Sequence, residues 1–281
     1  MSVNVTIKKK GLFKKNLKIE DVILDEMRYG IMDESYRLEE GKVGKYTVVF
    51  HSKHIGRGYE ISFEKGEVNL NMPLPTSYED IHFFYEYIKI LCDKWNTKEF
   101  IREEEKATFD EIDSFIKMDI KASEGALRQI EENINAGKYE NMYIFGAINP
   151  IAIGKKELAK IDGDVKKFGE LMHHLQKRDL YYATSQVYRR KDGTYFGVYV
   201  LTENVSSILP YQAKLLMADK EVSVTEWNIG FVADSELKGF IPYENFLNSI
   251  KKEEEYDSEH FIFKIKKKEI KELLDQYKID I

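Results

Sequence analysis

The sequence predicts an α+β fold in which mostly antiparallel sheets pack on a central apolar helix, with a helical segment in the middle of the chain. Stretches with the two-residue period of strands and stretches with the period of helices both recur, but they do not alternate regularly, which argues against a parallel α/β sheet. One stretch, residues 69–95, contains a helix that is apolar around so much of its circumference that most of it must be buried.

The N-terminal part is predicted to consist mainly of strands. Val3, Val5 and Ile7 alternate with polar residues, as in a strand with one buried face. Residues 19–27 place their apolar side chains on one face of a short helix, and residues 45–63 predict two strands joined by the loop HSKHIGRG.

The central helix is expected to follow a stiff proline turn. Pro73 and Pro75 lack a backbone N–H and fix φ, so the chain should leave the strand of residues 68–72 in an extended conformation. Thr76 stands three residues before Glu79, which is the spacing of a capping box. Apolar residues then recur at helical spacing, and those of the main face are Ile81, Phe84, Tyr85, Ile88, Leu91, Cys92 and Trp95. We expect this helix to be the main packing element of its domain.

Residues 103–137 are predicted to form the helical middle segment. Thr108 and Glu111 repeat the capping-box spacing. Ser123 is expected to start a second helix, which Gly137 closes. Acidic side chains fall mostly off the apolar stripe of this segment, so we expect them to form a solvated face.

The C-terminal part is predicted to mix strands and helices again. Residues 142–149 form an unbroken apolar run before Pro150, as in a central strand. The elements expected after it are a helix at 155–178 broken near Gly163, a hairpin at 186–203 with Asp192 and Gly193 at its tip, strands near 206–211, 224–233 and 261–265, a short helix at 242–250, and a closing helix at 267–279.

The order of these elements suggests how the chain divides into domains. We expect an N-terminal α+β unit over residues 1–102, a helical segment over residues 103–139 and a C-terminal α+β unit over residues 140–281. One continuous domain is the alternative, because 281 residues suffice for one large domain or for two smaller ones.

The composition narrows the class of protein. With 43% hydrophobic residues the chain can bury a substantial core, and its net charge of -6 argues against nonspecific nucleic-acid binding. The lysine-rich run of residues 8–18 is expected to be a solvated hairpin turn, with polyanion binding as the alternative. Cys92 is the single cysteine, so neither a disulfide framework nor a cysteine zinc site is expected. No apolar run suits a signal peptide or a membrane span, so we expect a cytoplasmic protein.

Two E-x-x-H segments form the sharpest pattern for a metal site. They are Glu79 with His82 and Glu170 with His173. On helices this spacing points both side chains the same way, as in di-iron carboxylate bundles. Such a site needs four long helices, whereas this chain is rich in strands and Glu79 is expected to cap a helix. We therefore expect neither a metal nor another cofactor.

Arg57 is the strongest candidate for contact with a ligand. A glycine flanks it on each side, so a sharp backbone turn could project its guanidinium toward a carboxylate or a phosphate. Together with Tyr59 and His82 it makes up the candidate ligand-binding site, and no catalytic residue is assigned. We nevertheless expect the structural interpretation, a tight loop in which Arg57 pairs with Asp80 or Glu79 at the start of the central helix.

Three segments carry a resemblance to a known family. They are IGRGYEISF, LNMPLPTSYEDIHFFYEYIKIL and YIFGAINP. Over most of its length the chain resembles a bacterial family of about this size that is defined only as a domain of unknown function. The resemblance implies a cytoplasmic protein of a Gram-positive-type bacterium. It implies no activity, cofactor or catalytic residue.

The expected function is therefore that of a non-catalytic protein that binds another protein. One version is an immunity-type protein, because an acidic surface suits a basic toxin. The alternative class is an enzyme or a small-ligand binder with its site near Arg57, Tyr59 and His82, which a deep pocket at these residues would favour. Neither nucleic acid nor membrane is an expected partner, and the sequence leaves the oligomeric state open.

Overall fold

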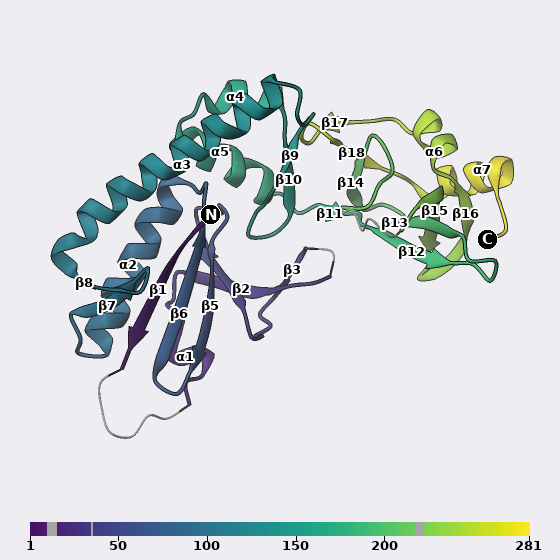
Figure 1. The fold of residues 1–281 in the computed structure, drawn as a ribbon. Helices are drawn as coiled ribbons and strands as arrows, with labels where there is room; N and C mark the ends of the chain where they lie inside the picture. The colour runs from purple at the N-terminus through teal and green to yellow at the C-terminus, as the bar shows by residue number, and fades with distance from the viewer. Residues whose placement is uncertain (10–15, 35, 217–221) are drawn as a thin grey trace. The chain divides into compact units, whose positions relative to one another are not determined.

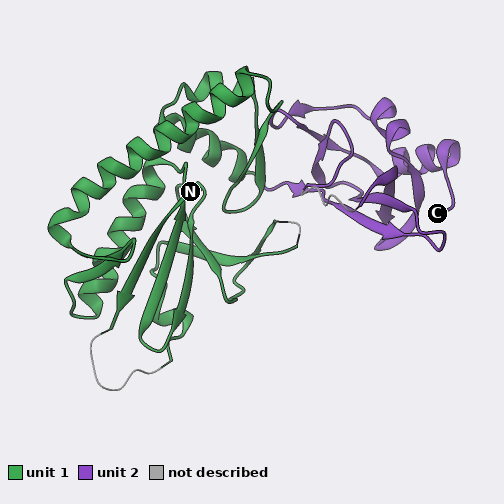
Figure 2. Ribbon diagram, viewed as in Figure 1, with its two compact units in different colours: residues 1–178 green, residues 179–281 purple. Residues whose placement is uncertain are grey.

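Strands with alternating buried residues and apolar helices build this chain, and the α+β class predicted from the sequence is confirmed (Figure 1). The residues that the computed structural model describes are 1–9, 16–34, 36–216 and 222–281. They divide into two compact units, residues 1–178 and residues 179–281 (Figure 2). Residues 10–15 of the lysine-rich run lie outside the described part of the chain.

In unit 1, the described residues form an antiparallel eight-stranded sheet in the order β3-β2-β4-β5-β6-β1-β7-β8. Its strands are β1 Ser2–Lys8, β2 Met27–Met32, β3 Leu38–Glu40, β4 Thr47–His51, β5 Tyr59–Glu64, β6 Glu67–Pro73, β7 Glu99–Arg102 and β8 Glu105–Thr108. In β1, Val3, Val5 and Ile7 are buried and the residues between them are not, as their alternation predicts. The short helix expected near residue 19 is a single turn, α1 (Ile19–Val22).

Helix α2 (Tyr78–Lys94) packs on this sheet, against β1 and β4. Phe84 is 0% exposed and Trp95, at the C-terminal cap, is 5% exposed. Burial of each such side chain contributes roughly 1.5–3 kcal/mol. The core of unit 1 gathers around α2, so the central packing role predicted for this helix is confirmed.

The capping box predicted for α2 was placed one residue too early. Ser77 is the N-cap, and its Oγ accepts a hydrogen bond from the Asp80 N–H at 2.9 Å. Thr76 instead donates its hydroxyl to Asp80 Oδ2 at 2.8 Å. Both Glu79 and Asp80 lie in the first turn, but Asp80 is the one that takes part in these hydrogen bonds.

The acidic middle segment is one helix preceded by a hairpin, not two helices. Strands β7 and β8 form the hairpin, and η1 (Phe109–Glu111) leads into α3 (Ile112–Asn135). Ser123 does not start a helix, because it lies within the continuous α3. Its Oγ accepts a hydrogen bond from the Thr76 N–H at 3.2 Å. The helix ends just before Gly137, as predicted.

The apolar run of residues 142–149 is not a central strand. Strands β9 (Met142–Phe145) and β10 (Pro150–Ile153) pair with each other in a two-stranded antiparallel sheet. The chain reverses between them because the Gly146 N–H donates to the Asn149 carbonyl oxygen at 3.1 Å. The run is apolar because a packed hairpin, not a single strand, is buried there.

Two helices complete unit 1. They are α4 (Lys155–Ile161) and α5 (Val165–Gln176), separated near Gly163 as predicted. Helix α5 packs against α2, α3 and α4. Because of these contacts, unit 1 includes all of the expected helical segment 103–139 and extends to residue 178. The division into units therefore differs from the three segments expected from the sequence.

Unit 2 consists, over its described residues, of two four-stranded sheets in the orders β11-β14-β18-β17 and β12-β13-β15-β16. Its strands are β11 Tyr181–Tyr182, β12 Ser185–Arg189, β13 Tyr195–Thr202, β14 Ser206–Pro210, β15 Val224–Ala233, β16 Glu236–Pro242, β17 Glu254–Glu255 and β18 His260–Lys264. Helices α6 (Tyr243–Ser249) and α7 (Lys267–Tyr277) pack on β16. Along the described parts of both units, no helix combines the length and the apolar character needed to cross a bilayer.

Candidate functional site

Arg57 joins three segments of unit 1. It lies in the loop between β4 and β5, and its backbone N–H donates to Asp80 Oδ2 at 2.8 Å. Its Nε donates to the Phe145 carbonyl oxygen at 3.0 Å, and its Nη1 donates to the Pro75 carbonyl oxygen at 2.7 Å. Burial lowers the pKa of the guanidinium to about 10, although the charge of Asp80 acts in the opposite direction. Asp80 is thus a partner, as expected, but it accepts from the backbone of Arg57 and not from the guanidinium.

The glycines on both sides of Arg57 are explained by packing. A Cβ at position 56 would lie 2.1 Å from Asp80 Oδ2. Gly58 has φ +65, which favours glycine, and a Cβ there would lie 2.4 Å from the Val49 carbonyl oxygen. Its N–H donates to Asp80 Oδ1 at 3.3 Å. These contacts make the glycine-arginine-glycine segment a tightly packed loop on the start of α2.

Tyr59 is enclosed in the core of unit 1. Its side chain is 1% exposed, and its ring lies 5.1 Å from that of Phe84 and 5.8 Å from that of Tyr87, between centroids. Its hydroxyl is buried without a hydrogen-bond partner among the described residues. Burial raises the pKa of Tyr59 well above its ordinary value.

His82 lies on another side of α2. Its half-buried ring packs on Tyr78 at 4.1 Å between centroids, and the Nζ of Lys166 lies 4.6 Å from the centre of the Tyr78 ring. Burial is the main cause that lowers the pKa of His82. Within the described part of the chain, no hydrogen bond, ion pair or ring contact links any two of Arg57, Tyr59 and His82. The structure therefore does not bring the three candidate residues together.

The E-x-x-H histidines have other surroundings. His173 accepts a hydrogen bond at Nδ1 from the Ile55 N–H at 3.1 Å, and its ring lies 6.3 Å from that of His54. Among the residues that the structure describes, no group of three or more His, Cys, Asp or Glu side chains is arranged to hold a metal ion.

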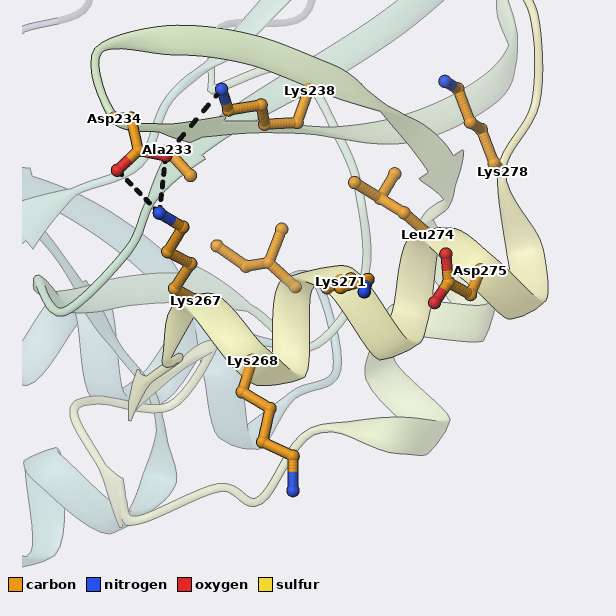
Figure 3. Close-up of a pocket in the computed structure, with 10 residues that line it drawn as sticks. Ala233, Asp234, Lys238, Lys267, Lys268, Lys271, Leu274, Asp275 and Lys278 are labelled. Atoms are coloured by element: carbon orange, nitrogen blue, oxygen red, sulfur yellow. Dashed lines mark hydrogen bonds and ion pairs between the residues drawn. The ribbon is translucent and has the colours of Figure 1, made fainter.

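A groove in unit 2 has the character of a binding site that the sequence did not suggest. It has a volume of about 820 Å³ and lies between α7 and the turn that joins β15 to β16 (Figure 3). Its apolar wall consists of Ala233, Ile270 and Leu274, and Leu274 points into the hollow in Figure 3. The charged residues that line it are Asp234, Lys238, Lys267, Lys268, Lys271, Asp275 and Lys278. Five lysines thus face two aspartates, which leaves the groove positive in a chain of net charge -6.

One end of the groove is closed by ion pairs. Asp234 and Ser235 have φ of 51 and 61 and form the two-residue turn between β15 and β16, a geometry that suits the twist of a hairpin. Lys267 Nζ donates to Asp234 Oδ1 at 2.7 Å, and Lys238 approaches the same carboxylate at 3.9 Å. The hydrogen bond from Lys267 lowers the pKa of Asp234 and raises that of Lys267.

Of the other lysines of the groove, one is paired and two remain available. Lys268 lies 3.6 Å from Glu272 on the exposed side of α7. Lys271 and Lys278 are exposed and have no ion-pair partner among the described residues. An apolar wall beside unpaired ammonium groups can bind a molecule that carries both apolar groups and negative charge. The sequence signal was a closing helix whose lysines alternate with apolar residues, but nothing in it indicated the turn that faces this helix.

Comparison with protein families gives a match over nearly the whole chain. A family model described as Domain of unknown function (DUF4299) matches residues 2–273 of the chain. No curated protein and no solved structure matches it.

Proposed function

The chain belongs to the family described as Domain of unknown function (DUF4299), and because that description names no activity, we propose from the structure that it is a non-catalytic protein whose unit 2 groove binds an acidic segment of a partner protein. The observation that supports this proposal is the groove itself, in which unpaired lysines flank an apolar wall. An acidic helix with apolar residues at helical spacing has the complementary character, since its apolar face fits a groove and its carboxylates meet the lysines.

Charge complementarity favours this occupant. Lys271 and Lys278 form no ion pair within the described part of the chain, although Asp275 also lines the groove, so a partner's carboxylates can form new ion pairs without displacing old ones. Leu274 supplies apolar surface that a purely ionic ligand would leave exposed. A basic toxin, which the net charge suggests as a partner, would be repelled here and would need an acidic surface elsewhere.

A peptide titration tests the proposal. The probe is a fluorescein-labelled helical peptide of glutamate and leucine, and the control probe carries lysine in place of each glutamate. We expect the acidic peptide to bind, and its affinity to fall as salt is added, because exposed charges are screened. Replacing Lys271 and Lys278 together by Gln should weaken binding about fivefold to tenfold, which corresponds to about 1–1.4 kcal/mol.

Matched variants distinguish binding at the groove from nonspecific attraction between the peptide and the charge of the protein. Replacing Lys117 and Lys121 of α3 by Gln removes the same charge from exposed helical positions in unit 1 and should leave the affinity unchanged. Leu274→Asn should weaken binding without altering charge. Equal binding by the lysine variant of the groove and the wild type would contradict the proposal. Binding of decanoate without the peptide would point to a small amphipathic anion, and binding of the lysine peptide would favour a basic partner at another surface.

A further inference from the structure

Two histidines hold the loop between β4 and β5 through the same kind of hydrogen bond. His51 Nδ1 accepts from the Lys53 N–H at 3.0 Å, and His173 Nδ1 accepts from the Ile55 N–H at 3.1 Å. An imidazole nitrogen can accept only while it carries no proton, and both ring nitrogens are donors once the ring is protonated. Each of these bonds therefore requires a neutral ring with its hydrogen on Nε2.

The hydrogen bonds of His51 and His173 argue against metal binding by these two rings and indicate a response to pH instead. A metal ion would need a lone pair on Nε2, but in both neutral rings Nε2 carries the hydrogen while Nδ1 faces a backbone N–H. Protonation, by contrast, would turn both Nδ1 acceptors into donors that face other donors. We propose that the loop of residues 52–58 is released from its two histidine contacts at mildly acidic pH, so that unit 1 contains a pH-sensitive device.

The groups around the rings favour release. His54 of the loop lies 5.3 Å from the His51 ring and 6.3 Å from the His173 ring, between centroids, so protonated rings repel one another. Lys177 and His174 of α5 add to this, and with burial as the main cause they lower the pKa of His173. Glu26, which precedes β2, has its carboxylate 3.6 Å from His51 Nε2, where it can pair with the protonated ring.

The direction of the pH effect follows from these surroundings. The pKa of His173 in the folded state lies below its ordinary value of 6.5, so the unfolded or opened loop takes up the proton first. The stability of the closed loop is therefore complete above about pH 6.5 and falls as the pH decreases below it. Release would also weaken the contacts of the loop with α5 and with the turn after β9. In these contacts the Gly56 carbonyl oxygen accepts from Gln176 Nε2 at 2.6 Å and from the Ala147 N–H at 3.0 Å.

Amide hydrogen exchange of the full chain tests the proposal. After correction for the intrinsic pH dependence of exchange, we expect protection of the Lys53 and Ile55 amides to drop about tenfold or more from about pH 7.5 to about pH 5. Amides of β6, which has no histidine partner in the described chain, should keep their protection. Unchanged protection of Lys53 and Ile55 over this range would overturn the proposal.

A substitution that keeps the acceptor but removes the titration sharpens the test. Asparagine places Oδ1 where histidine places Nδ1, so replacing His51 and His173 together by Asn should preserve the loop's protection near neutral pH and abolish its decrease in acid. His82→Asn, on α2 and without a bond to the loop, should retain the pH dependence of the wild type. A double variant with the wild-type pH dependence would show that other groups control the loop.

Discussion

At the scale of single residues, Arg57 shows how a residue with the features of a ligand contact can serve the fold. Its guanidinium donates to two backbone carbonyl oxygens, those of Phe145 and Pro75. Its backbone shares Asp80, which is 2% exposed, with Gly58 and Thr76. A half-buried cation with these partners holds three chain segments together.

We predict that Arg57→Ala lowers the free energy of unfolding by about 2–4 kcal/mol, because two partly buried carbonyl oxygens lose charged donors. Arg57→Lys should lower the free energy of unfolding by most of the same amount, since one ammonium group lacks the geometry of the planar guanidinium. Chemical denaturation measures both. Arg128→Ala, an exposed arginine of α3, is the control and should cost under about 0.5 kcal/mol. Equal effects at the two positions would contradict the structural role of Arg57.

At the scale of elements, local sequence patterns were sufficient to predict a helix or strand wherever its own residues show the period of that structure. The alternation of β1, the apolar face of α2 and the break between α4 and α5 were all predictable for this reason. The β7–β8 hairpin was not, because its turn residues Glu103 and Glu104 favour helices in general, while β7 exists by pairing with the distant β1. The register of the α2 cap also depends on distant residues, since the loop at Gly58 fixes which carboxylate is buried.

The α2 cap can be tested by a pair of substitutions. Ser77→Ala should destabilise the protein by about 0.5–2 kcal/mol, because the Asp80 N–H loses its acceptor at the helix start. Glu79→Ala should cost under about 0.5 kcal/mol, since Glu79 takes no part in the observed cap. Thermal or urea denaturation distinguishes the two positions. A larger loss at Glu79 than at Ser77 would place the capping box where the sequence alone suggested it.

At the scale of the whole molecule, the candidate site depends on contacts that no local pattern contains. The lysines of α7 are visible in the sequence, but Lys267 meets Asp234 across 33 positions of chain. The candidate residues Arg57, Tyr59 and His82 also lie in neighbouring predicted elements. In the structure, however, Tyr59 packs on Phe84 of α2, whereas His82 of the same helix packs on Tyr78. The sequence could therefore suggest candidate residues, but it could not predict that distant residues form the groove or that two histidines bind the loop between β4 and β5.

The two units each have a core of their own, which predicts how the chain unfolds. Phe84 and Phe231 are both 0% exposed and belong to the cores of unit 1 and unit 2, respectively. Domains with separate cores unfold as separate cooperative units when their interaction is weak. We therefore predict two transitions in chemical denaturation, with Phe84→Ala shifting one and Phe231→Ala the other.

Each truncation should cost about 3–5 kcal/mol in its own transition, as buried phenylalanines do. Intrinsic fluorescence can distinguish the transitions, because Trp95 lies in unit 1 and Trp227 in unit 2. If Phe84→Ala and Phe231→Ala instead shifted one common transition by similar amounts, the two units would unfold as a single cooperative structure. In that case a ligand in the unit 2 groove would also stabilise unit 1, whereas two transitions confine its stabilising effect to unit 2.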